Sequence, residues 1–194
     1  GRPRGFARHR CHDSLEEMKS RHLSYWLIPT VEHCSVLQTV INKLASRFDV
    51  SPFPPHLTIF AGPLAAEDEP LLLLESLPPD LVPQELEVNQ VEVSDRFTMT
   101  LFLRCQNESK LVSLHEYVRA NSPSSNYCLD PHLSLLYADI PLATKESLAD
   151  EFESPLKKIQ FDRIRAVSHL SPVQTQEDID NFQDIGEVIF QPKQ

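Results

Sequence analysis

The regular pattern of apolar and polar residues begins at Ser24. The mostly apolar run from Ser24 to Ile28, ended by Pro29, predicts a β-strand. Apolar residues then recur three and four positions apart, which predicts an amphipathic helix with Thr30 as its N-cap. The apolar face of that helix consists of Val36, Leu37, Val40, Ile41 and Leu44.

The rest of the chain continues this succession of strands and helices. Further strands are predicted over residues 55–61, 86–93, 97–105, 131–138, 159–170 and 185–191. Helices are predicted over residues 67–77 and 144–157, and a third begins near 107 and includes Leu111, Leu114 and Val118. Residues 1–22 show no sustained period, so we expect a flexible basic tail there.

These elements occur twice in the same order. Helices that begin near 31 and 67 are matched by helices at 107 and 144, and the strand at 55 by one at 131. Chance spacing of ordinary elements is the alternative, but we interpret the match as two similar lobes. The sequence therefore predicts an α+β fold with a single bilobal domain over residues 23–194. Each lobe is a small, mainly antiparallel sheet with two helices, and the site lies in the cleft between the lobes.

Charge argues against a long nucleic acid as the main partner. The 194 residues carry a net charge of −10, and residues 1–23 hold six basic and three acidic side chains. The rest of the chain therefore has 12 basic and 25 acidic residues. Binding of a polyanion strengthens with the number of phosphates that Lys and Arg neutralise, so this part is a poor general binder. A small anionic ligand in a locally positive pocket is compatible with this charge.

Composition also bears on the cellular setting. No apolar run approaches the roughly 20 residues that cross a bilayer, and the N-terminal segment lacks the apolar stretch of a secretory signal. The four cysteines form no C-x-x-C pair, so reduced thiols are preferred to a zinc site, and two disulfides are the open alternative. We expect a cytoplasmic monomer with no membrane partner.

One short motif is repeated at matched positions of the two rounds. The sequence P-H-L-T-I at 55–59 returns as P-H-L-S-L at 131–135. Because residues two apart in a strand point to the same face, His56 and Thr58 project together, as do His132 and Ser134. If the lobes are related by an approximate two-fold axis, the two strands bring both pairs to one cleft.

Two imidazoles and two hydroxyls suit metal-free phosphoester chemistry. Opening a cyclic phosphodiester needs one group to take a proton from water and another to protonate the departing alkoxide, and histidine can do either near neutral pH. The Thr58 and Ser134 hydroxyls can donate hydrogen bonds to phosphate oxygens. A single H-x-T is a worthless signal, whereas two matched copies are hard to explain by packing.

At these residues the sequence resembles the two-histidine (2H) phosphoesterases, which carry paired His-x-Thr/Ser motifs on a two-lobed α+β fold. The stretch 131–138, P-H-L-S-L-L-Y-A, is especially similar to the second motif of the cyclic phosphodiesterases of plants and fungi. The first strand, with Tyr25-Trp26 ahead of Pro29, and the order of elements over residues 24–191 are also similar to that family.

The resemblance implies a hydrolase of small cyclic phosphates that needs no metal and no cofactor. Its substrates would be nucleoside 2′,3′-cyclic phosphates, opened to 2′-phosphates, and ADP-ribose 1″,2″-cyclic phosphate from tRNA splicing, opened to the 1″-phosphate. It further implies His56 and His132 as the acid and base, with Thr58 and Ser134 holding the phosphate. We favour His132 as base and His56 as acid, although a pseudo-symmetric site can work from either side.

Two aromatic residues are candidate substrate-binding residues. Trp26, the only tryptophan, matches the family's aromatic near the mouth of the site and could stack on a nucleobase, or it could equally be a core residue. Tyr137 lies near the phosphate by the resemblance, but strict alternation from His132 places it on the opposite face unless the strand bends or ends there. The remaining histidines, including His169 at the end of a strand, are assigned no functional role.

Two other functions are compatible with the sequence. One is a relative that acts on RNA ends, an RNA 2′,3′-cyclic or 2′,5′-phosphodiesterase or ligase, against which the acidic body argues. The other is a non-catalytic nucleotide-binding module, against which the two intact motifs argue.

Overall fold

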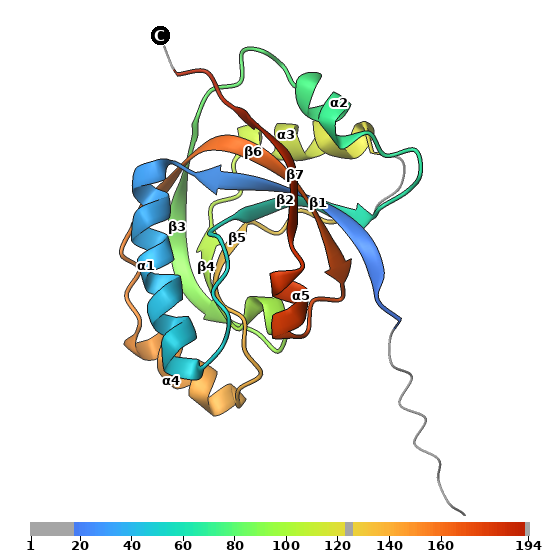
Figure 1. Cartoon of the computed structure of the whole chain (residues 1–194). Helices are drawn as coiled ribbons and strands as arrows, with labels where there is room; N and C mark the ends of the chain where they lie inside the picture. The colour runs from blue at the N-terminus through green and yellow to red at the C-terminus, as the bar shows by residue number, and fades with distance from the viewer. Residues whose placement is uncertain (1–17, 123–125, 193–194) are drawn as a thin grey trace, which may run out of the picture.

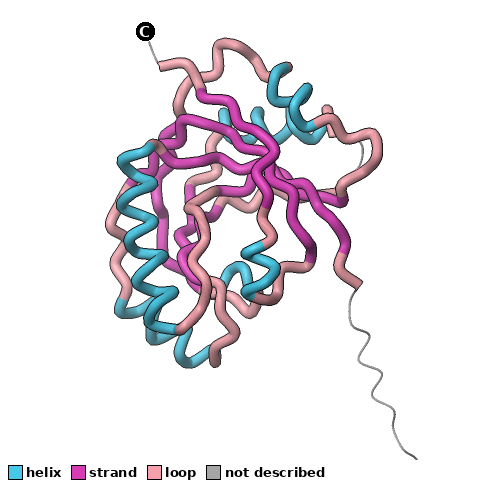
Figure 2. The backbone as a smooth tube through the Cα atoms, viewed as in Figure 1, coloured by secondary structure: helices cyan, strands magenta, loops and turns pink. Residues whose placement is uncertain are grey.

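The computed structural model describes residues 18–122 and 126–192 (Figure 1). In chain order its elements are β1 (Ser20–Pro29), α1 (Val31–Phe48), β2 (Leu57–Pro63), α2 (Pro70–Glu75), β3 (Gln84–Val93), the 3₁₀ turn η1 (Phe97–Met99), β4 (Leu101–Cys105), α3 (Ser109–Ala120), β5 (His132–Leu136), α4 (Leu142–Glu151), β6 (Lys158–Ser171), α5 (Gln176–Asp180) and β7 (Gln183–Ile189). Figure 2 shows strands crossing the centre of the molecule with the helices outside them.

All the strand pairings are antiparallel. The sheet has two halves, one with β1, β2, β6 and β7 and the other with β3, β4 and β5, and they are connected at two places. The order is β1-β2-β5-β4-β3-β6-β7, with a further pairing between β1 and β6. The long β6 pairs with β1 and β7 of one half and with β3 of the other. The halves meet again where β2 and β5 pair through Leu57 and Leu133. The expected α+β fold with a mainly antiparallel sheet is confirmed.

The helices are shared between the two halves in a way that element order does not reveal. Helices α2 and α3 pack against β2, β6 and β7, whereas α4 packs against β3 and β4 and α1 against β5 and β1. Figure 1 shows α1 and α4 on one side of the strands and α2 and α3 on another. Each half therefore takes one helix from each round of the sequence.

The elements differ from the predictions in several places, and the helix predicted over 144–157 already ends at Glu151. Strand β1 begins at Ser20, within the expected tail, because its first residues pair with the end of β6, as His22 does with His169. The predicted strand over 97–105 begins with the turn η1, where the Thr100 hydroxyl donates to the Phe97 carbonyl at 2.9 Å. Helix α5 was not predicted; its start is held by a capping box between Thr175 and Asp178. Residues 1–17 of the predicted tail lie outside the described part.

Several local predictions are confirmed. The Thr30 hydroxyl accepts a bond from the backbone N–H of His33 at the start of α1, and Pro70 occupies the first turn of α2. In the two motifs, the residues between the paired side chains, Leu57 and Leu133, are fully buried.

Over the described ranges, no helix is both long enough and apolar enough to cross a membrane.

The contact between Leu57 and Leu133 generates a stability prediction. Replacing Leu133, which is 0% exposed, with alanine leaves a cavity where the two motif strands meet, so we expect about 2–5 kcal/mol less free energy of unfolding. Urea denaturation followed by circular dichroism measures the loss. Leu72→Ala, at an exposed position, is the control and should change stability by under about 0.5 kcal/mol. Equal effects of the two substitutions would contradict this account of the junction.

Candidate active site

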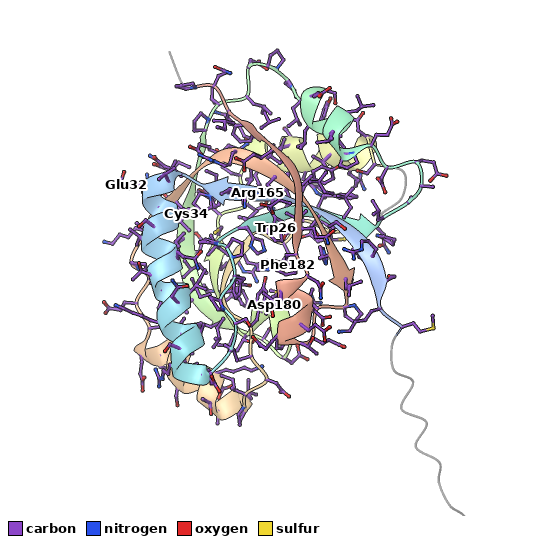
Figure 3. The ribbon with its side chains drawn as sticks, in the orientation of Figure 1. Trp26, Glu32, Cys34, Arg165, Asp180 and Phe182 are labelled. Atoms are coloured by element: carbon purple, nitrogen blue, oxygen red, sulfur yellow. The ribbon has the colours of Figure 1, made fainter. Side chains whose placement is uncertain are left out.

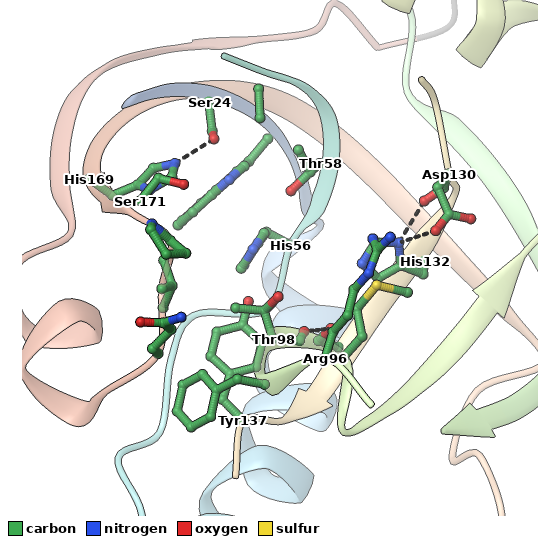
Figure 4. Close-up of a pocket in the computed structure, with 18 of the residues that line it drawn as sticks. Ser24, His56, Thr58, Arg96, Thr98, Asp130, His132, Tyr137, His169 and Ser171 are labelled. Atoms are coloured by element: carbon green, nitrogen blue, oxygen red, sulfur yellow. Dashed lines mark hydrogen bonds and ion pairs between the residues drawn. The ribbon is translucent and has the colours of Figure 1, made fainter. Parts of the chain in front are cut away.

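A cavity of about 650 Å³ lies where the two motif strands meet. Figure 4 shows His56 in the middle, with Ser24, His169 and Ser171 to one side and Asp130 and His132 to the other. Every site residue expected from the sequence lines this cavity: Trp26, His56, Thr58, His132, Ser134 and Tyr137.

His56 lies immediately before β2, and its ring is held from one edge. Nδ1 lies 2.6 Å from the carbonyl oxygen of Pro54, so it carries the proton and donates it there, which leaves Nε2 as the ring nitrogen available to a ligand. The side chain is buried at 7% exposure. Burial is the main cause that lowers the pKa of His56 to about 3, and positive charge at His132 acts in the same direction. His56 is therefore neutral in the ligand-free protein.

His132, the first residue of β5, is held in the same way. Its Nδ1 lies 2.6 Å from the carbonyl oxygen of Asp130 and 3.7 Å from a carboxylate oxygen of the same residue. Arg104 in turn binds the Asp130 and Glu92 carboxylates. Burial lowers the pKa of His132, the nearby arginines add to this, and the Asp130 carboxylate opposes it.

A proline precedes each histidine, and this shared feature explains the matched hydrogen bonds. Proline fixes its own φ and keeps the residue before it extended. Pro55 and Pro131 therefore hold the carbonyl groups of Pro54 and Asp130 beside the rings of the histidines two residues later. The same local geometry occurs in both rounds, so in both imidazoles Nε2 is the nitrogen available to a ligand.

Both hydroxyl residues, Thr58 and Ser134, line the cavity. The Ser134 hydroxyl donates to the backbone carbonyl of Thr98 at 2.6 Å, so it must change partner before it can donate to a ligand. Thr58 is half-buried and lines the cavity.

Both aromatic candidates are buried. Trp26 is 3% exposed and its ring stacks on His56, with centroids 3.7 Å apart and planes 15° apart. Tyr137 is 4% exposed and stacks on Phe53 at 3.7 Å. Strand β5 ends at Leu136, so the chain leaves the alternation of the strand just where Tyr137 must turn to reach the cavity.

His169 lines one side of the cavity and was not predicted as a site residue from the sequence. The Ser24 hydroxyl lies 2.7 Å from Nε2 of His169, whose Nδ1 lies 3.0 Å from the carbonyl of Leu170. Nδ1 therefore carries the proton, and Nε2 accepts from Ser24. No motif marks this residue, because the antiparallel pairing of β1 with β6 alone brings it to the cavity. Gln174, from the segment before α5, also lines this side.

An arginine and an aromatic residue complete the lining and were also missed. Arg96, from the segment between β3 and β4, lies near His132 (Figure 4) and lowers the pKa of its imidazole. Phe182, which precedes β7, meets the Trp26 ring edge-on at 5.5 Å, and Figure 3 shows the two close together. Both came from segments between the predicted elements, where the sequence has no period to interpret.

The described residues contain no group of three or more His, Cys, Asp or Glu side chains placed to hold a metal ion. Cys34, Cys105 and Cys128 are free thiols. Burial raises the pKa of the Cys105 thiol to about 12, so this thiol stays protonated at neutral pH. Cys11 lies outside the described residues.

The family model of the cyclic phosphodiesterase-like proteins matches residues 21–190. The chain belongs to this family. The resemblance to the plant and fungal cyclic phosphodiesterases of the 2H type is thereby confirmed, and so is the expected class of enzyme, a cyclic phosphodiesterase.

Two relatives extend this comparison. The "Cyclic phosphodiesterase" of Arabidopsis thaliana is 26% identical over 153 residues, which cover 76% of this chain and 83% of the plant protein. The "2′,3′-cyclic-nucleotide 3′-phosphodiesterase" of Phaeosphaeria nodorum is 29% identical over 145 residues, which cover 66% of this chain and 74% of the fungal protein.

Solved structures of LigT from E. coli share the fold. Its apo form aligns with a TM-score of 0.58 at 13% identity and covers 91% of this chain and 100% of LigT. The complex of LigT with 3′-AMP aligns with a TM-score of 0.54 at 15% identity and covers 89% of this chain and 99% of LigT.

Proposed function

We propose that this cyclic phosphodiesterase opens nucleoside 2′,3′-cyclic phosphates to nucleoside 2′-phosphates, and ADP-ribose 1″,2″-cyclic phosphate to ADP-ribose 1″-phosphate, by acid–base catalysis between His56 and His132. The observation that carries the proposal is that both imidazoles line one cavity with Nδ1 bonded to the backbone, so that each has Nε2 for proton transfer. The fungal relative named for 2′,3′-cyclic nucleotides supports the substrate class.

The reaction requires two proton transfers at opposite sides of the phosphorus. One neutral imidazole takes a proton from water while the water oxygen forms a bond to phosphorus. The P–O3′ bond breaks, and the imidazolium on the other side gives its proton to the departing 3′ oxygen. Hydrogen bonds from Thr58 and Ser134 to the non-bridging oxygens stabilise the charge that develops there. Exchange of protons with solvent then restores both histidines.

The surroundings of the two histidines favour His132 as the acid. The Asp130 carboxylate, 3.7 Å from Nδ1 of His132, stabilises a proton on that ring. His56 instead packs against the Trp26 ring and is deeply buried, so a positive charge on it is less favourable. A bound phosphate anion raises both pKa values, and the proton then goes first to His132. This assignment is the opposite of the one favoured from the sequence.

The proposal also covers the metal requirement and the size of the substrate. The acid–base pair needs no metal ion, so activity should survive a chelator. The acidic body is expected to disfavour RNA ends relative to mononucleotides. Faster turnover of an oligonucleotide that ends in a 2′,3′-cyclic phosphate than of 2′,3′-cyclic AMP would favour the RNA-end function instead.

Replacing either histidine tests the proposed function directly. We expect His56→Ala and His132→Ala each to lower kcat/KM on 2′,3′-cyclic AMP by about 10³-fold or more, because each removes one of the two proton transfers. Phosphorus NMR follows the reaction and also shows whether the 2′- or the 3′-phosphate forms. His33→Ala, on the outer helix α1, is the control and should keep full activity. Full activity in His132→Ala would end the proposal, as would binding of 2′-AMP by a wild-type protein that turns over no cyclic phosphate.

A substrate with a good leaving group tests which histidine is the acid. Catechol cyclic phosphate releases a phenolate, which departs with little need of a proton. We therefore expect His132→Ala to lose much less activity on catechol cyclic phosphate than on 2′,3′-cyclic AMP, by about 10²-fold, whereas His56→Ala loses similar activity on both. Initial rates of the two variants on the two substrates give this ratio. The reverse pattern would make His56 the acid.

A further inference from the structure

We propose that Trp26 is a positioning residue for His56: its indole ring holds the imidazole in the orientation that points Nε2 at the phosphate, and it does not serve as a platform for the nucleobase. The inference rests on the proposed function of His56 and extends it to a residue that acts through the histidine.

The first observation is the stack itself. The two ring centroids lie 3.7 Å apart with an interplanar angle of 15°, which places one face of the indole against the whole imidazole. The bond from Nδ1 to Pro54 fixes one edge of the imidazole but leaves rotation about that bond open. A flat ring pressed against the imidazole removes that freedom. The Phe53 ring meets His56 edge-on at 6.2 Å and restricts it further.

The second observation is that Trp26 is itself held in place. Its side chain is 3% exposed and packs in a small cluster with Ile28 and Val167. The Phe182 ring meets it edge-on at 5.5 Å and 77°. A residue that stacks on a nucleobase needs an exposed face, and Trp26 has almost no exposed surface. Its rigid surroundings suit a support for a catalytic side chain.

The third observation is the contrast with His132. The Phe102 ring meets His132 edge-on at 5.5 Å and 69°, and the Asp130 carboxylate fixes the same imidazole from its Nδ1 side. His132 is thus held by a charge and His56 by a flat apolar surface. The indole therefore keeps water from one face of His56 and helps hold this ring neutral.

Kinetics on two substrates separate positioning from nucleobase binding. The substrates are 2′,3′-cyclic AMP and methyl ribofuranoside 2,3-cyclic phosphate, which has no base. If Trp26 positions His56, Trp26→Leu lowers kcat by roughly 100-fold on both substrates, because a small misplacement of a catalytic group costs about that much. KM stays within about threefold on both. Trp26→Phe keeps an aromatic face of smaller area, so its kcat falls only several-fold.

A second measurement reports on His56 without turnover. NMR titration of ¹³C-labelled histidine gives the pKa of each imidazole. We expect the pKa of His56, about 3 in the wild type, to rise towards 6.5 in Trp26→Leu, because water reaches the exposed face. The charged or titratable groups that act on His56 are His132, His169 and Arg165, and none of them is changed. Phe190→Leu removes a similar buried ring outside the cavity and should leave both kcat and the pKa unchanged.

Two results would overturn the positioning role of Trp26. A rise in KM for 2′,3′-cyclic AMP alone, with the base-free substrate unaffected, would make Trp26 the nucleobase platform and overturn the proposal. An unchanged His56 pKa together with a loss no larger than that of Phe190→Leu would also overturn it. If Trp26→Leu fails to fold, Trp26→Phe decides: a higher His56 pKa with a several-fold lower kcat supports positioning, and no change in either opposes it. A wild type without turnover refutes the proposed function, while the titration still tests the contact.

Discussion

The site depends on a hydrogen bond from the histidine ring to the backbone, and the same bond occurs in both motifs. In each motif the imidazole Nδ1 is bonded to the backbone carbonyl two residues earlier, across a proline that fixes the intervening backbone. This bond selects the tautomer, orients the ring and leaves Nε2 for chemistry. If either imidazole were free to turn, the cavity would still be present, but the proposed proton transfer on both sides of a phosphorus would lose its geometry. The hydroxyls, the aromatic walls and the charged residues all act around these two fixed rings.

The fold brings the two rings together by joining its halves at two places. Strand β6 pairs with strands of both halves, and Leu57 and Leu133 meet between β2 and β5. These leucines are the central residues of the two motifs, so the contact that joins the halves also sets the spacing of the histidines beside it. The exchange of helices between the halves reinforces the same junction, since α1 packs against both β1 and β5. Stability and the proposed catalysis are therefore coupled through the motif strands.

The sequence predicted most of the strands and helices and the residues of both motifs, because period, proline placement and a repeated motif are local signals. It could not predict which helix covers which half, since packing of α1 against β5 joins segments far apart in the chain. His169 was overlooked for the same reason: only the pairing of β6 with β1 carries it to the cavity. Trp26 was singled out as a substrate-binding candidate and lines the cavity, but its contact with His56 depends on ring orientation, which no sequence pattern encodes.

The most direct test of the central claim is the tautomer of the His56 and His132 imidazoles, measured by ¹⁵N NMR at neutral pH with and without 2′-AMP. The account predicts that both rings carry their proton on Nδ1, that Nε2 is unprotonated in the free protein, and that 2′-AMP shifts the Nε2 signals of both His56 and His132. A ring protonated on Nε2 alone, or a phosphate ligand that perturbs only one of the two histidines, would contradict it.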